Sequence, residues 1–160
     1  MNNSPIAQYR TQLIEEMQFW DEEFQESVND FSYRMLAASM IGQLRYKLYR
    51  FNRIAAGLRL GLELKGTHAW CLLLQDASSP GQYRYQVFDE RGFSGHSTHP
   101  NLEAALVAAF QEGFCEEGEG ALLRLYGSDS WQHGMRAAGL IQEVNSGQIT
   151  HEQAEQRYSA

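Results

Sequence analysis

The sequence of 160 residues predicts an α+β fold, in which a long N-terminal helix or helical hairpin packs on an antiparallel sheet. Two different spacings of apolar residues support this prediction. Through about residue 57, apolar residues recur about every 3.6 positions, as on one face of a helix. From residue 58 they alternate at every second position, as in a strand. We expect one domain over 1–160, with a helical part (1–57), an antiparallel sheet of about four to five strands with one inserted helix (58–126), and C-terminal helices (127–160), two to three in the fold as a whole.

The N-terminal part begins with Ser4-Pro5, which is typical of a helix cap followed by proline in the first turn. Apolar residues then recur in steps of three and four from Ile6 to Met35, which predicts an amphipathic helix. Asn29-Asp30 is a candidate break that would cap a second helix. Either one long helix or a helical hairpin therefore extends from about residue 5 to about residue 57.

The middle of the chain predicts an antiparallel meander of about three or four strands. LRLGLEL (58–64) alternates with period two, and HAWCLLLQ (68–75) is a short apolar run typical of a more buried strand. QYRYQVF (82–88) alternates again, and GFSGHST (92–98) follows a tight DERG turn as its hairpin partner. Such a meander has short connections and needs no crossover helix.

The last third predicts helices around one more strand. Asn101 is a candidate N-cap for a helix that ends at Gly113. CEEGEGA (115–121) predicts an acidic, glycine-rich loop, and ALLRLY (121–126) a last short strand. SDSW (128–131) opens a helix that extends to about Val144, and Thr150 with Gln153 predicts a capping box for a final short helix.

The charge is distributed in blocks. The whole chain has a formal net charge of −7, which argues against a general nucleic-acid coat because phosphate contacts need cations. Residues 1–30 carry seven acids and one base, residues 31–60 carry six bases and no acid, and the remaining hundred residues have a net charge of −7. Blocks of this kind often mark contact surfaces. The acidic segments 15–30 and 112–119 are therefore a second candidate interface.

The sequence also indicates a compartment. The first residues, MNNSPIAQYR, have neither the positive region nor the apolar region of a signal peptide. The longest apolar runs, AWCLLL and AALVAAF, are much shorter than the roughly 20 residues that span a bilayer. Two cysteines, Cys71 and Cys115, make no disulfide framework. We therefore expect a reduced, intracellular protein in the cytoplasm.

The segment RYKLYRFNR, residues 45–53, places four cations and three aromatics in nine positions of this acidic chain. On a helical wheel at 100° per residue, its apolar residues share one face, while its cations and tyrosines lie on the opposite face. Tyrosine and arginine are strongly enriched at interface hot spots, and arginine also stacks on rings and grips carboxylates or phosphates. We therefore predict a partner-binding surface made of Arg45, Tyr46, Tyr49, Arg50 and Arg53.

Four interpretations of this surface are open from the sequence. The bases pair internally with the acidic first helix, or they contact an acidic protein partner or another subunit. Alternatively, they bind nucleic acid by phosphate contact and base stacking, or lie on an anionic membrane surface. Because the segments 1–30 and 31–60 have opposite charge, a second copy of the chain is also a candidate partner.

Other patterns indicate no catalytic, metal or cofactor site. His96 and His99 form H-x-x-H, and His68 with Cys71 forms H-x-x-C, but no second pair completes the three or four ligands that zinc needs. GFSGH (92–96) lacks the last glycine of a nucleophile elbow. No phosphate-binding glycine loop occurs, and the carboxylate pairs 89–90 and 116–117 fall in predicted turns.

We therefore expect a non-enzymatic protein that binds another macromolecule, with a protein as the favoured partner. A regulator, inhibitor, adaptor or immunity-type role fits this expectation. The alternative is a nucleic-acid-binding accessory protein that uses the same 45–53 helix face, with binding that weakens steeply as salt increases.

Overall fold

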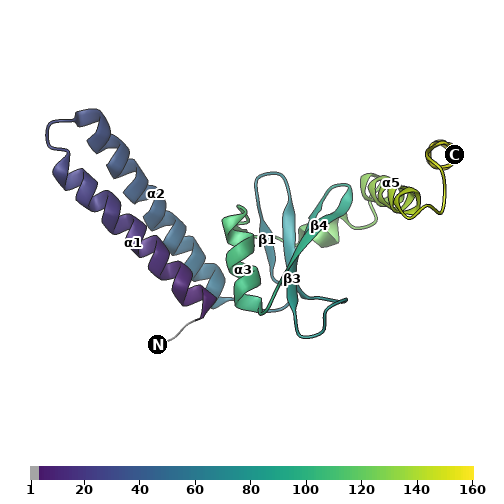
Figure 1. The fold of residues 1–160 in the computed structure, drawn as a ribbon, viewed down its shortest axis with the longest axis horizontal. Coiled ribbons are helices and arrows are strands. Elements are labelled where there is room, and N and C mark those ends of the chain that lie inside the picture. Colours follow the sequence, from purple (N-terminus) through teal and green to yellow (C-terminus); the bar gives the residue numbers. More distant parts are fainter. Residues whose placement is uncertain (1–3) are drawn as a thin grey trace.

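The computed structural model describes residues 4–160, and Figure 1 shows their arrangement in three parts. A hairpin of two long helices projects from one side, a sheet with one packed helix forms the centre, and short helices lie on the far side. The predicted α+β architecture is confirmed, with the N-terminal part as a hairpin and not one long helix. Among the described residues, no helix is long and apolar enough to cross a membrane.

The hairpin consists of α1 (Pro5–Glu26) and α2 (Phe31–Ala56). The break lies at the predicted position, because the Asp30 carboxylate accepts a hydrogen bond of 3.0 Å from the backbone N–H of Tyr33 and so caps α2. Ser4 caps α1 in the same way, with Pro5 in the first turn. The tip of the hairpin is therefore the short turn over residues 27–30.

The sheet has five strands within residues 4–160, in the spatial order β4-β3-β2-β1-β5, and each neighbouring pair is antiparallel. The strands β1 to β4 form the predicted meander. The bounds are β1 (Glu63–Lys65), β2 (Trp70–Gln75), β3 (Tyr83–Asp89), β4 (Gly92–His99) and β5 (Glu116–Glu117).

The main core joins the base of the hairpin to one face of the sheet. The helix α3 (Leu102–Gln111), capped by Asn101 as predicted, lies between them. Phe51 of α2 packs edge-on against Tyr9 of α1 and Phe110 of α3, with ring centroids 4.8 and 5.1 Å apart. Because the buried residues of this cluster end at Leu13 on α1 and at Leu44 on α2, the tip of the hairpin extends away from the body.

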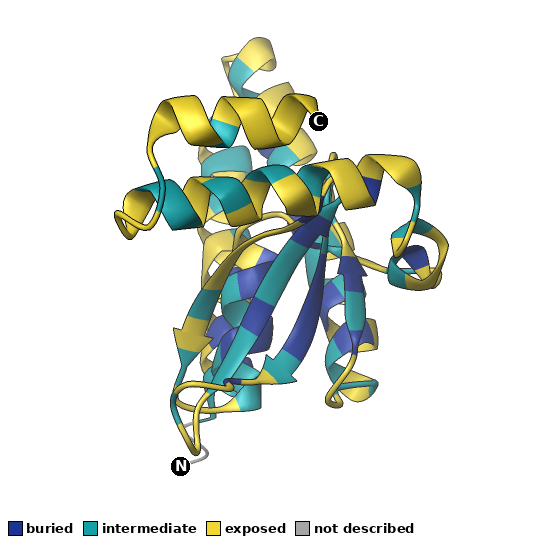
Figure 2. Cartoon of the chain, turned by 90° about the vertical axis from the view of Figure 1, so that its right-hand side faces the viewer, coloured by how far each residue is buried: buried dark blue, intermediate teal, exposed yellow. Residues whose placement is uncertain are grey.

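A smaller core covers part of the other sheet face. It contains Leu72, Phe88, Ala121 and Trp131, the last from α5 (Asp129–Asn145). Figure 2 shows α5 and α6 (His151–Ser159) crossing one end of the sheet, while α6 contributes no buried residue. Both helices were predicted, and the capping box of Thr150 and Gln153 is present.

Two predicted strands are wrong in part or entirely. The strand expected over 58–64 begins only at Glu63, because residues 58–62 form a turn in which Gly61 has φ of +77°. The strand expected over 121–126 is instead the short helix α4 (Ala121–Leu125). The Glu63 carboxylate accepts hydrogen bonds of 2.8 and 3.1 Å from the N–H groups of Ala121 and Leu122, and this satisfies the start of the helix.

Candidate functional site

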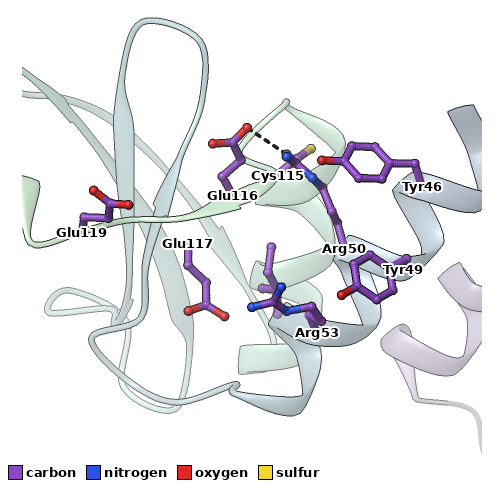
Figure 3. A pocket seen from close by; sticks show the side chains of 9 residues that line it. Tyr46, Tyr49, Arg50, Arg53, Cys115, Glu116, Glu117 and Glu119 are labelled. Carbon is purple, nitrogen blue, oxygen red and sulfur yellow. Dashed lines mark hydrogen bonds and ion pairs between the residues drawn. The ribbon is translucent and has the colours of Figure 1, made fainter.

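A cleft of about 370 Å³ lies between the last turns of α2 and the segment that follows α3. Figure 3 shows its side chains, with Tyr46, Tyr49, Arg50 and Arg53 on α2 facing three glutamates on the other side. These glutamates are Glu116, Glu117 and Glu119. The cleft therefore brings the basic segment 45–53 against the acidic loop 115–119.

The chain reaches this position through two local features. Gly113, after the end of α3, has φ of +101°, a backbone conformation that residues with a Cβ rarely adopt. The next residues form β5, in which Glu116 pairs with Lys65 and Glu117 with Leu64 of β1. The carboxylate pair 116–117 was predicted in a solvated turn. The turn is wrong, because both residues belong to an edge strand beside α2, but their predicted exposure to solvent is confirmed.

Arg50 is the central residue of the cleft. Its Nη1 lies 2.8 Å from Oε1 of Glu116, and its guanidinium carbon lies 4.5 Å from the centroid of the Tyr46 ring. The hydrogen bond to Glu116 raises the pKa of Arg50, and the same bond lowers the pKa of Glu116. Arg50 is therefore held in one orientation between a carboxylate and an aromatic face.

The two tyrosines and Arg53 of the cleft are more exposed than Arg50. Tyr46 and Tyr49 keep 56% and 57% of their surface exposed, although both are large aromatic residues. The Arg53 guanidinium lies 6.0 Å from the Tyr49 ring centroid, and Arg53 takes part in neither of the ion pairs found within residues 4–160. Figure 3 shows its guanidinium directed toward the Glu117 carboxylate on the facing wall. These side chains leave polar tips and ring faces accessible to another molecule.

Four of the five predicted site residues, from Tyr46 to Arg53, line this cleft, whereas Arg45 is exposed outside it. Sequence reasoning placed the acids 112–119 on a separate surface and did not join them to α2. Cys115 also lines the cleft. Its thiol donates a hydrogen bond of 3.3 Å to the carbonyl of Phe110, and burial raises its pKa. The charge blocks were the one sequence signal for this meeting of acids and bases.

The contacts between α1 and α2 bear on the predicted internal pairing of acids with bases. No ion pair in the described chain joins an acid of α1 to a base of α2. Instead, Arg10 of α1 donates a hydrogen bond of 2.6 Å to Asn52 of α2, and Tyr33 of α2 donates one of 2.6 Å to Glu23 of α1. Among the bases of α2, Arg34 packs on the Phe24 ring of α1, whereas Arg50 and Arg53 line the cleft.

The histidines and Cys71 lie apart from this cleft. Cys71 is fully buried in the main core, where burial raises the pKa of its thiol to about 12. Burial lowers the pKa of His99, whereas His96 is exposed on β4. Among residues 4–160, no group of three or more histidine, cysteine, aspartate or glutamate side chains is placed to hold a metal ion.

Comparison of the chain with protein-family models, with curated proteins and with solved structures gave no match.

Proposed function

We propose that this is a non-enzymatic binding protein that recognises another protein through the outward face of α2 and the adjoining acidic loop. The observation that carries the proposal is the exposure of Tyr46 and Tyr49 beside the guanidiniums of Arg50 and Arg53. Tyrosine rings bring large contact area with few flexible bonds, and tyrosine and arginine dominate the binding energy of many interfaces. A regulator, inhibitor, adaptor or immunity-type role uses such a surface.

The charges of the cleft favour a protein over a nucleic acid. Two arginines face three glutamates, and Arg50 already pairs with Glu116. A phosphate backbone would meet carboxylates on one side of this cleft, and carboxylates repel phosphate. A protein can instead offer a basic group to the glutamates and an acidic or aromatic group to Arg53. We place this activity in the cytoplasm, since Cys71 and Cys115 are both free thiols.

Photo-crosslinking tests the proposal. A benzoylphenylalanine at position 49 is expected to form a covalent adduct with a protein when the source cells are irradiated. The matched control carries the same group at Tyr158, which is a similarly exposed tyrosine on α6. The adduct at position 49 should disappear when Arg53 is changed to Glu. Equal adducts from positions 49 and 158, or none from 49, would contradict a binding role for this face.

Fluorescence anisotropy tests whether the partner is a nucleic acid and not a protein. Labelled single- and double-stranded DNA and RNA are titrated with the protein at about 50 and about 200 mM salt. We expect no binding at the lower salt concentration. Micromolar binding that collapses at the higher concentration, and that is lost when Arg45, Arg50 and Arg53 are all changed to Glu, would replace the protein partner by a nucleic acid.

A further inference from the structure

The outward face of α2 carries a continuous row of side chains from the tip of the hairpin to its base. At 100° per residue, seven positions between residues 31 and 53 fall within about 40° of one direction, and this direction is far from the side that packs on α1. We call this row the α2 seam, and it consists of Phe31, Met35, Ala38, Gly42, Tyr46, Tyr49 and Arg53. The seam thus extends the proposed binding face along the whole helix.

The seam exposes large apolar and aromatic side chains at both of its ends. Phe31 and Met35 are 78% and 55% exposed at the tip, and the two tyrosines are exposed at the base. Between them lie two small residues, the exposed Ala38 and Gly42, and Gly42 has no atom within 4 Å of the place where a Cβ would stand. A row with large residues at both ends and small residues in the middle allows another helix to approach closely at Gly42.

The spacing of the seam is symmetric about Gly42. The steps between its residues are four, three, four, four, three and four. When α2 is laid antiparallel on a second α2 with a two-fold axis at Gly42, each seam residue meets its mirror position. Phe31 then meets Arg53 of the other copy, Met35 meets Tyr49, and Ala38 meets Tyr46.

Each of these pairs is chemically favourable. A guanidinium on a phenylalanine ring forms a cation–π contact, and a thioether at a tyrosine ring forms a sulfur–aromatic contact. Alanine leaves room for the larger tyrosine, whose ring covers the alanine methyl group and removes it from water. A two-fold interface requires such self-complementarity, since residue i of one copy meets residue j of the other and the reverse.

The charges of the hairpin favour the same antiparallel arrangement. The acids Glu26 and Asp30 are exposed at the tip, whereas Arg53 and Arg59 are exposed at the base. Antiparallel pairing brings the acidic tip of one hairpin to the basic base of the other. Parallel pairing would place like charges together, which is unfavourable.

The cleft described above would receive the tip of the other copy. It lies on the flank of α2 beside Tyr49 and Arg53, the two seam residues at the base of the hairpin. In the antiparallel arrangement, these positions face Met35 and Phe31 of the other copy. The exposed ring of Phe31 then lies at a cleft whose α2 wall carries tyrosines and arginines and whose other wall carries three glutamates.

We propose that the protein forms a two-fold dimer through antiparallel α2 seams that cross at Gly42. This inference rests on the proposed function and names the partner of that same face, a second copy of the chain. Helix axes 8–10 Å apart would bring the two Cα atoms at position 42 to about 4–5 Å, within reach of a disulfide.

Cysteine crosslinking tests the geometry. In a Cys115→Ser background, Gly42→Cys is expected to give a disulfide-linked dimer under mild oxidation. Gln43→Cys is the matched control, because position 43 is exposed on the same helix but points about 100° away from the axis. A mixture of Met35→Cys and Tyr49→Cys chains should crosslink as a heterodimer, whereas neither variant should crosslink alone. A Gly42→Cys disulfide no faster than that of Gln43→Cys would overturn the seam.

Light scattering across about 1 to 200 μM protein tests the dimer itself. We expect the dimer to dissociate on dilution, and to weaken several-fold between about 50 and 500 mM salt as its charges are screened. A monomer at every concentration would overturn the dimer. If position 49 then forms a photo-adduct with a different protein, the proposed binding function stands without the dimer. If position 49 forms no adduct with any protein, both proposals are overturned.

Discussion

The guanidinium of Arg50 lies 2.8 Å from the carboxylate of Glu116, although 66 residues separate them in the chain. This contact joins the last turns of α2 to the edge strand β5. It sets the orientation of Arg50 in the cleft, and it uses one of the three glutamates that face the basic helix. The other arginine of the cleft, Arg53, keeps its charge available for a partner.

Removing the Arg50–Glu116 pair is expected to change binding more than folding. Both side chains are partly exposed, at 29% and 50%, so solvent screens their attraction and the pair adds little stability. Glu116→Gln should therefore leave Tm almost unchanged at neutral pH while weakening capture of the partner through the freed Arg50. A large fall in Tm, measured by differential scanning calorimetry, would show instead that the pair holds the fold.

The same pair gives a pH dependence with a definite sign. Arg50 holds the pKa of Glu116 below its ordinary value of 4.5, so the folded chain releases this proton more readily than the unfolded chain. The stabilisation is present above the ordinary value and is lost as pH falls through the lower, folded value. The small difference in Tm between wild type and Glu116→Gln should close between about pH 5 and pH 3. A difference that grows over this range would contradict the assignment.

Phe51 and Phe31 lie on the same helix and should behave in opposite ways. Phe51 has no exposed surface and contacts the rings of Tyr9 and Phe110. Phe51→Ala is expected to cost about 3–5 kcal/mol of unfolding free energy because it leaves a cavity. Phe31→Ala, at the exposed tip, should leave the stability of the monomer within about 0.5 kcal/mol of wild type. Urea denaturation of dilute protein checks both values.

Two glycines of α5 form a second matched pair. A Cβ at Gly134 would overlap the backbone carbonyl of Arg91, because α5 packs closely on the β3–β4 turn at this point. Gly134→Ala is therefore expected to cost about 1–3 kcal/mol through overpacking. At Gly139 nothing lies within 4 Å, so Gly139→Ala should instead gain up to about 1 kcal/mol of helix propensity. Equal effects in thermal denaturation would contradict this packing of α5.

The two thiols should differ in reactivity. Cys71 is buried with its pKa raised to about 12, whereas Cys115 is only partly buried and has a smaller rise. Iodoacetamide at about pH 8 is expected to modify Cys115 in the native protein and to leave Cys71 unmodified, since the thiolate is the reactive form. Both should react in urea. Mass spectrometry of the peptides measures the two rates, and similar native rates would place Cys71 outside the core.

Much of the fold could be predicted because its signals are local. The N-caps Ser4, Asp30 and Asn101 each mark a helix start within a few residues. The apolar run 68–75, the period-two segment 82–88 and the tight turn after it mark β2 to β4. The Asp30 cap explains why the N-terminal part is a hairpin and not one long helix. Helical periodicity alone also places Tyr46, Tyr49 and Arg53 on one helix face.

The parts that sequence reasoning missed depend on distant residues. The short apolar segment 121–126 suggests a strand. The structure makes it a helix, whose first N–H group is capped by the Glu63 carboxylate, 58 residues earlier in the chain. The meeting of Arg50 with Glu116 depends on how β5 pairs with β1, and strand register is not visible in the composition of either segment. Charge blocks indicate that surfaces will meet something, but they do not identify the partner.

The packing of Tyr9, Phe51 and Phe110 in the main core also determines when this core can form during synthesis of the chain. Phe110 packs against both Tyr9 and Phe51, with ring centroids 6.1 and 5.1 Å apart. The helices α1 and α2 therefore cannot complete their core until α3 has left the ribosome. During that interval the nascent hairpin carries uncovered aromatic surface at its base as well as along α2, and it depends on the later sheet for protection from aggregation.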